Sequence, residues 1–173
     1  MKKLATAACL LALVIVAGCG QGPDTSTTAT AAPTTSSTSV SLVTYSADLS
    51  GKNETPAVTT SASGSATFTL DPSGSTVAYV IDVTMISGVT VARIHVGKTG
   101  ATGGAILTLF PGPTKKGLFS GVLAQGSFTA AKLSGTLKGH TIADLVALIK
   151  SGEVYLNIGT TKHPSGEIRG QFQ

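Results

Sequence analysis

The chain has 173 residues, a formal charge of +4, and few charged or aromatic side chains, which make up 12% and 5% of it. This length suffices for one ordinary domain with additional segments. Lys2 and Lys3 precede a long apolar run, so the rest of the chain holds ten basic against eight acidic residues. It contains no basic stripe with interleaved aromatics, which argues against nucleic acid as a partner.

The N-terminus has the organisation of an export signal. "MKK" supplies positive charge, and "LATAACLLALVIVA" has the length of a signal-peptide apolar region, shorter than the roughly 20 residues of a transmembrane helix. The following "VAGC", which ends at Cys19, resembles the bacterial lipobox. The resemblance implies a signal peptide over residues 1–18 and a lipidated Cys19 that carries acyl chains such as palmitate. The alternative is an ordinary secretory peptide cut near Ala17, with Cys19 incidental.

A lipidated Cys19 predicts an extracytoplasmic protein, lipid-anchored to a bacterial membrane. That membrane is the outer membrane or cell surface if the organism is Gram-negative. Residues 19–42 are predicted to be the lipidated cysteine and a disordered tether, since 12 of the 22 residues from 20 to 41 are Ser or Thr. Such a stretch buries too little apolar surface to offset the entropy of ordering it. Beyond Cys19 no thiol remains, which excludes disulfides and cysteine-based zinc sites there.

Residues 43–173 are predicted to form one mainly β domain. "GSATFTLD", "STVAYVIDVTM", "VTVARIHVG" and "GGAILTLF" are apolar or alternating runs separated by turn residues such as "PSG". Short strands at this spacing are typical of an antiparallel β-sandwich. One short helix is expected near residues 141–151. There, Ile142, Leu145, Val146 and Ile149 follow the spacing of one helical face, and Thr141 can cap it.

Alternation along the strands predicts a polar patch. In "VARIHVG", Arg93 and His95 face away from the apolar set, and Asn157 does so in "EVYLNIG". In "EIRGQF", Glu167 and Arg169 share the outward face. If the three strands are neighbours, these five residues form one surface, and Glu167 pairs with Arg93 or Arg169 or accepts from backbone donors. The simpler interpretation is an ordinary solvent face of a half-buried sheet.

The same segments carry a resemblance to a known family. "SADLSGKNETPAV", "ARIHVGKTGATGGAILTLF" and "LIKSGEVYLNIGTTKHPSGEIRGQF" resemble the CHRD domain, first described in chordin and common in bacterial exported proteins. The resemblance covers roughly residues 45–173. It implies a compact β-sandwich with an outline like that of immunoglobulin-like and Cu/Zn superoxide dismutase-like folds, and no settled activity. Its C-terminal motif corresponds here to Gly152, Tyr155, Asn157, Thr160, Pro164, Gly166, Glu167, Ile168, Arg169, Gly170 and Gln171.

The chain departs from the family pattern where the family usually carries histidines. Arg93 replaces the first His of H-I-H, and Gly159 replaces the His before Thr160. The metal prediction is therefore none, with His95, His163 and Glu167 as weak candidates. Arg93 adds a fixed positive charge that opposes a cation. "HPSGE" is most simply a turn into the last strand.

These features favour a non-enzymatic binding or structural module of the cell envelope. The sequence contains no nucleophile elbow, HExxH pair or P-loop, and no catalytic residue or cofactor is predicted. The alternative is a metal-binding (Cu/Zn) or dismutase-like protein that uses His95, His163 and Glu167. Predicted partners are the membrane, through the lipid, and an envelope protein or glycan. The few aromatics argue against a sugar-stacking platform.

Overall fold

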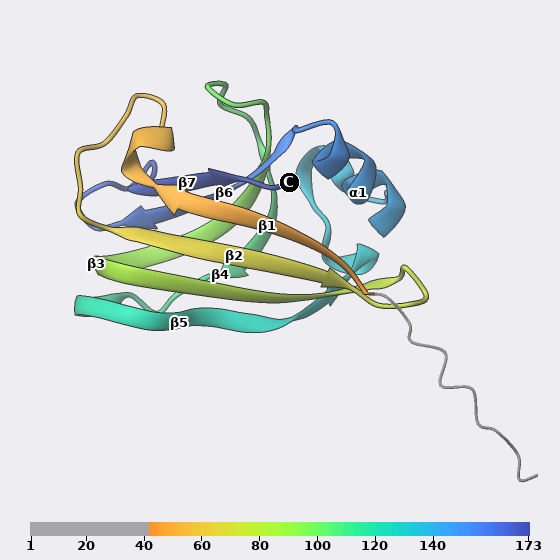
Figure 1. Cartoon of the computed structure of the whole chain (residues 1–173), viewed down its shortest axis with the longest axis horizontal. Helices are drawn as coiled ribbons and strands as arrows, with labels where there is room; N and C mark the ends of the chain where they lie inside the picture. The colour runs from red at the N-terminus through yellow and green to blue at the C-terminus, as the bar shows by residue number, and fades with distance from the viewer. Residues whose placement is uncertain (1–41) are drawn as a thin grey trace, which may run out of the picture. The chain divides into compact units, whose positions relative to one another are not determined.

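The computed structural model describes residues 42–173 (Figure 1). The predicted signal peptide, Cys19 and residues 20–41 lie outside them. Seven strands, one α-helix and three short 3-10 helices make up this part of the chain. The strands are β1 (Val43–Ser50), β2 (Ser63–Leu70), β3 (Thr76–Val96), β4 (Ala105–Phe110), β5 (Lys115–Thr129), β6 (Val154–Thr160) and β7 (Ile168–Gln171). The helices are α1 (Ile142–Lys150), η1 (Gly51–Asn53), η2 (Ala130–Lys132) and η3 (Gly135–Leu137).

All strands belong to one antiparallel sheet with the order β2-β1-β7-β6-β3-β4, and β2 also pairs with β3. Strands β1, β2, β3, β6 and β7 therefore close into a five-stranded barrel, while β4 and β5 extend it from β3. The prediction of a mainly β, antiparallel domain is confirmed. A sandwich is not, because the hydrogen-bonded pairings are continuous from strand to strand.

Closure of the barrel depends on β3, which is 21 residues long and pairs with different strands along its two halves. Its first half pairs with β2 and β5, and its second half pairs with β6 and β4. Between the halves Met85 and Gly88 have positive φ values of 55° and 67°, and the register with β5 shifts. Irregularities of this kind bend a strand and increase its twist, which carries β3 from one side of the barrel to the other.

The core follows from the alternation seen in the sequence. Val154, Leu156 and Ile158 are fully buried on β6, as predicted. Phe172, just after β7, stacks on Phe68 of β2 with ring centroids 4.2 Å apart. These side chains fill the barrel, and their burial supplies most of the stabilisation at about 25 cal/mol per Å² of apolar surface.

The predicted helix is confirmed as α1, which lies at one end of the strands (Figure 1). Thr141 is its N-cap and forms a capping box with Asp144, whose side chain accepts from the Thr141 backbone at 2.8 Å. Ile142, Leu145 and Ile149 are buried against the barrel. At nine residues α1 is the only α-helix of the described region, and no helix there is long and apolar enough to cross a membrane.

Candidate functional site

The outward-facing polar residues of β3, β6 and β7 stand in register across three neighbouring strands. Arg93 pairs with Asn157, and Asn157 pairs with Arg169. In the next row His95 pairs with Tyr155. Directly paired residues of antiparallel strands point to the same side of the sheet, so these five residues share one face. The structure thus brings together Arg93, His95, Asn157 and Arg169 of the predicted patch.

Glu167 does not belong to this face. It precedes β7, and only 7% of its surface is exposed. Its carboxylate accepts hydrogen bonds from the hydroxyls of Thr60 and Thr160, each at 2.7 Å. The expected ion pair with Arg93 or Arg169 is wrong, since among residues 42–173 the ion pairs are Lys98–Glu153 and His140–Asp144. The alternation argument failed because Glu167 lies outside the strand, where the chain is turning.

Arg169 is the most unusual member of the polar face. It is 3% exposed, and its guanidinium carbon lies 3.4 Å from the centre of the Tyr155 ring. The His95 ring stacks on Tyr155 with centroids 5.1 Å apart and planes 15° apart. Because β6 lies between β3 and β7, His95 and Arg169 reach Tyr155 from its two sides. Such cation–π and stacking contacts hold the guanidinium in one orientation.

His95 is held in place by the loop that follows β3. Its Nδ1 lies 2.9 Å from the Gly103 carbonyl oxygen, and the Gly103 amide donates to the Tyr155 hydroxyl at 3.1 Å. Burial lowers the pKa of His95 below its ordinary value. The positive charges of Arg93 and Arg169 act in the same direction, against the hydrogen bond to Gly103. His95 is therefore a neutral stacking partner at pH 7.

Sequence reasoning missed Glu54, which lies just after η1 and is 9% exposed. Its Oε2 is 3.4 Å from the Asn157 side-chain nitrogen, while its Oε1 is buried without a partner. Burial raises the pKa of Glu54 to about 7, against the opposing charge of Arg169 and a backbone hydrogen bond from Thr55. No periodic pattern marks a single carboxylate in an irregular loop, so only the three-dimensional packing reveals it.

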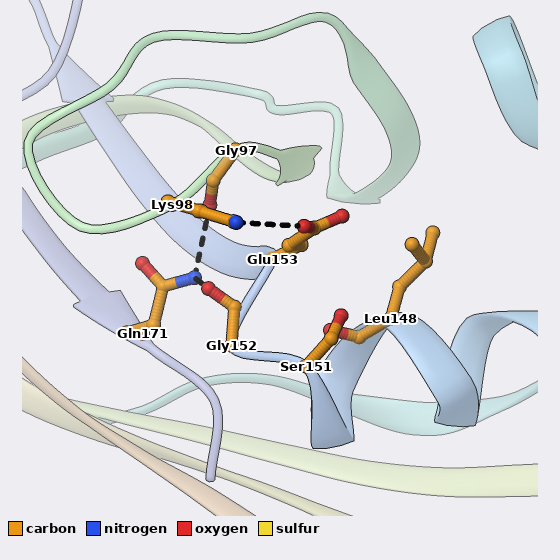
Figure 2. Close-up of polar contacts among 7 residues, drawn as sticks. All are labelled: Gly97, Lys98, Leu148, Ser151, Gly152, Glu153 and Gln171. Carbon is orange, nitrogen blue, oxygen red and sulfur yellow. Dashed lines mark hydrogen bonds and ion pairs between the residues drawn. The ribbon is translucent and has the colours of Figure 1, made fainter.

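Two small pockets flank the polar face. One, of about 300 Å³, is lined by Glu54, Lys162, His163 and the turn around Gly166. The other, of about 130 Å³, is lined by Asn53, Thr99, Arg169 and Gln171. Figure 2 shows one lining residue of the second pocket, Gln171: its side-chain nitrogen donates to the Gly97 and Gly152 carbonyls at 2.9 and 2.8 Å, near the Lys98–Glu153 pair.

The weak metal candidates do not converge. His95 is opposite Tyr155 on β6, whereas the Glu167 carboxylate reaches Thr160, five residues further along that strand. At 3.3 Å per residue the two places are about 16 Å apart, too far for one ion. The part of the chain that the structure describes contains no group of three or more His, Cys, Asp or Glu side chains arranged to hold a metal.

Gly159 stands where the family usually carries the histidine before Thr160, and its surroundings leave no room for a side chain. A Cβ at this position would lie 2.9 Å from the Pro164 carbonyl oxygen and 3.2 Å from a methyl group of Val91. The "HPSGE" turn, with the Gly166 amide donating to the His163 carbonyl at 3.1 Å, therefore packs directly against this glycine. A histidine at residue 159 requires the turn to move.

The fold and this polar network define a class of protein: a closed antiparallel β domain with a buried Arg–Tyr contact between its last two strands and a buried, hydroxyl-bonded Glu in the turn that joins them. The CHRD domain family model matches residues 45–172, and the chain belongs to that family. No curated protein and no solved structure shows significant similarity to the chain. Tyr155, Asn157, Thr160, Glu167 and Arg169, which carried the resemblance in the sequence, are the residues that build this network.

Proposed function

We propose that this protein is a non-enzymatic binding module of the bacterial cell envelope, anchored to the membrane through a lipid on Cys19. Its CHRD domain is the part that binds, and its partner is an envelope protein or glycan. The observation that carries the proposal is the pair of preformed polar pockets, both lined by residues that the internal network holds in place. Preformed pockets with a few fixed polar groups are typical of binding sites.

The chemistry of the site supports binding rather than turnover. Glu54 has the pKa expected of a general acid or base at neutral pH, but its Oε1 is buried and its Oε2 faces Asn157. Both oxygens of Glu167 are occupied by threonine hydroxyls. Within residues 42–173 neither carboxylate hydrogen-bonds to a histidine, the contact by which a catalytic triad orients its histidine base.

Support for the anchor comes from the order of the N-terminal segments: positive charge, apolar run and "VAGC". Several acyl chains give stable membrane attachment, where one chain alone is marginal. The Cys19→Ser variant should lose partitioning into the detergent phase. A variant that is processed and still partitions like the parent would contradict the anchor.

A thermal-shift screen of the full chain tests the binding proposal. The ligands are envelope glycans, peptides and the ions Cu²⁺ and Zn²⁺. We expect an organic ligand to raise Tm in a saturable manner, since a ligand that binds the folded state stabilises it by mass action. Stabilisation by a metal alone, with stoichiometric metal retained after dialysis, would favour the dismutase-like alternative. The finer prediction of an immunoglobulin-like or superoxide dismutase-like sandwich outline also remains a proposal, which an experimental structure would decide.

A further inference from the structure

Arg169, which lines the smaller pocket, carries a positive charge without an ion-pair partner among the described residues. Arg169 is 97% buried, yet no carboxylate of the described residues lies within 4.0 Å of its nitrogens. Its neighbour Lys98 is already paired with Glu153 at 3.4 Å. A buried guanidinium without an ion-pair partner is costly, and proteins normally pair such charges.

Most of the hydrogen-bonding capacity of Arg169 remains unused. A guanidinium has five N–H donors. Nη2 donates to the Lys98 carbonyl at 3.0 Å, the one hydrogen bond that this side chain makes within the described region. The buried side-chain polar atoms without a partner are Ser50 Oγ and Glu54 Oε1, so the remaining Arg169 nitrogens are in contact with accessible space. Arg169 is also one of the four residues that line the 130 Å³ pocket.

Of the other lining residues, Thr99 has a hydroxyl that can donate or accept, whereas the amides of Asn53 and Gln171 offer acceptors. The Asn53 side-chain nitrogen donates to the carbonyls of Asp48 and Arg169, at 3.3 and 3.1 Å. The Gln171 nitrogen donates to two carbonyls as well, and in Figure 2 its oxygen points away from both of them. With their nitrogens occupied, these two amides offer only oxygens to a ligand. The pocket thus combines cationic donors with neutral acceptors.

We infer that this pocket, formed by Asn53, Thr99, Arg169 and Gln171, binds the C-terminal carboxylate of a peptide. A planar carboxylate matches the two-pronged donor pattern of a guanidinium. The terminal residue of a peptide also carries an N–H donor next to its carboxylate, which suits the amide oxygens. A volume of about 130 Å³ admits one small residue, so the rest of the peptide lies outside. The inference rests on the proposed binding function and names its ligand.

A peptide fits the pocket better than an acidic sugar does. Sugar-binding sites commonly present an open aromatic face. Tyr155, the aromatic residue next to the pocket, is 2% exposed and has His95 on one side and Arg169 on the other. Binding here must therefore depend on charge and hydrogen bonds. Glu54, which is largely neutral below its pKa of about 7, does not cancel the positive charge of Arg169 in that range.

The test is a titration of the full chain in detergent, followed by the NMR shifts of the Thr99 amide and the Arg169 Nε–H. The probes are N-acetyl-L-alanine, its neutral amide N-acetyl-L-alaninamide, and D-glucuronate. We expect N-acetyl-L-alanine to bind saturably and at least about tenfold more tightly than the amide, because the charged hydrogen bonds are lost. Equal binding of acid and amide, or no binding of the acid, would overturn the inference. Tighter binding of glucuronate would overturn the peptide assignment.

Two variants test whether N-acetyl-L-alanine binds in this pocket. Arg169→Gln removes the charge, and Thr99→Phe fills the pocket from an exposed position that supports no part of the core. Both should weaken binding of N-acetyl-L-alanine at least about tenfold, whereas Arg93→Gln, on the same face but outside the pocket, should not. Should Arg169→Gln not fold, Thr99→Phe decides: undiminished binding by it would overturn the inference. If no carboxylate binds while the thermal-shift screen finds another envelope ligand, the inference fails and the proposed function stands.

Discussion

Glu167 and Glu54 are buried to nearly the same extent, with 7% and 9% of their surface exposed, but their surroundings differ. Glu167 accepts two hydroxyl hydrogen bonds at 2.7 Å. Those hydroxyls accept in turn from the backbone amides of Ala62 and His163, each at 3.1 Å. Glu54 has a long side-chain contact to Asn157 at 3.4 Å and a backbone hydrogen bond from Thr55, while its Oε1 has no partner.

The two carboxyls therefore differ in their effect on stability. Hydrogen bonds compensate the burial of Glu167, whereas the burial of Glu54 is poorly compensated. Glu167 links the loop before β2, the end of β6 and the start of β7. Each threonine hydroxyl donates to its carboxylate and also accepts from a backbone amide of the threonine's own segment. Glu54 loses hydration on burial and recovers little, so the protonated form is favoured and its pKa rises to about 7. Burial of a carboxyl stabilises a protein only where donors replace the lost water.

The largest effect is expected from Glu167→Ala. The change removes two hydrogen bonds to a charged group, at about 1.5–3 kcal/mol each, and leaves the Thr160 hydroxyl buried without its acceptor. The free energy of unfolding in urea should fall by about 3–5 kcal/mol. Glu153→Ala is the control, since its pair with Lys98 is partly exposed to solvent and its loss should cost less than about 1 kcal/mol. Equal losses in both variants would contradict the linking role of Glu167.

Gly166→Ala should cost about 2–3 kcal/mol, because it combines backbone strain with a collision. Gly166 has φ of +146°, and an added Cβ would lie 2.5 Å from Glu54 Oε1 and 2.6 Å from the Asn157 amide. Gly139→Ala is the control: its φ is +84° and nothing lies within 4 Å of the added atom. We expect a loss of about 1 kcal/mol there, and urea midpoints measure both. A tolerated Gly166→Ala would show that the two side chains are not packed around this glycine.

Glu54 should make the stability depend on pH. Its folded-state pKa of about 7 lies above the ordinary 4.5, so the folded protein binds the proton more tightly than the unfolded chain does. The stabilising contribution is complete below pH 4.5 and is lost as pH rises to about 7. Relative to Glu54→Gln, the parent should lose roughly 2–3 kcal/mol over this range, measured by urea unfolding. A constant difference between parent and variant would mean that Glu54 has an ordinary pKa.

The smallest effect is expected from Ser50→Ala, which removes the other buried polar atom without a partner. Ser50 pairs with Arg169 across β1 and β7, but its hydroxyl makes no hydrogen bond. Stability should change by less than about 0.5 kcal/mol. In the control Ser134→Ala, the lost hydroxyl donates to the Ile106 carbonyl at 3.0 Å, and the cost should be about 1 kcal/mol. A larger loss at Ser50 than at Ser134 would reveal a partner of the Ser50 hydroxyl in solution.

The sequence alone determined the local elements and the polar rows of the sheet. Periodicity in "VARIHVG" and "EVYLNIG" assigned the inward and outward residues of β3 and β6, and the capping residues located α1. These features depend on residues close together in the chain, where side-chain alternation and capping act. The C-terminal motif likewise indicated the CHRD family, because its residues lie within one continuous stretch of the chain.

Only the tertiary structure decided what the polar residues do. Glu167 was expected to pair with Arg93 or Arg169 or to accept from backbone donors, but the chain turns before β7 and its carboxylate accepts from the Thr60 hydroxyl, more than 100 positions away in the sequence. The isolated charge of Arg169 and the raised pKa of Glu54 arise from the same kind of long-range packing. Closure of the barrel depends on the bend in β3, whose two halves pair with different strands. The partner of Glu167, the burial of Arg169 and Glu54, and the strand pairing of β3 all depend on which distant segments pack together. Local sequence patterns do not specify that packing.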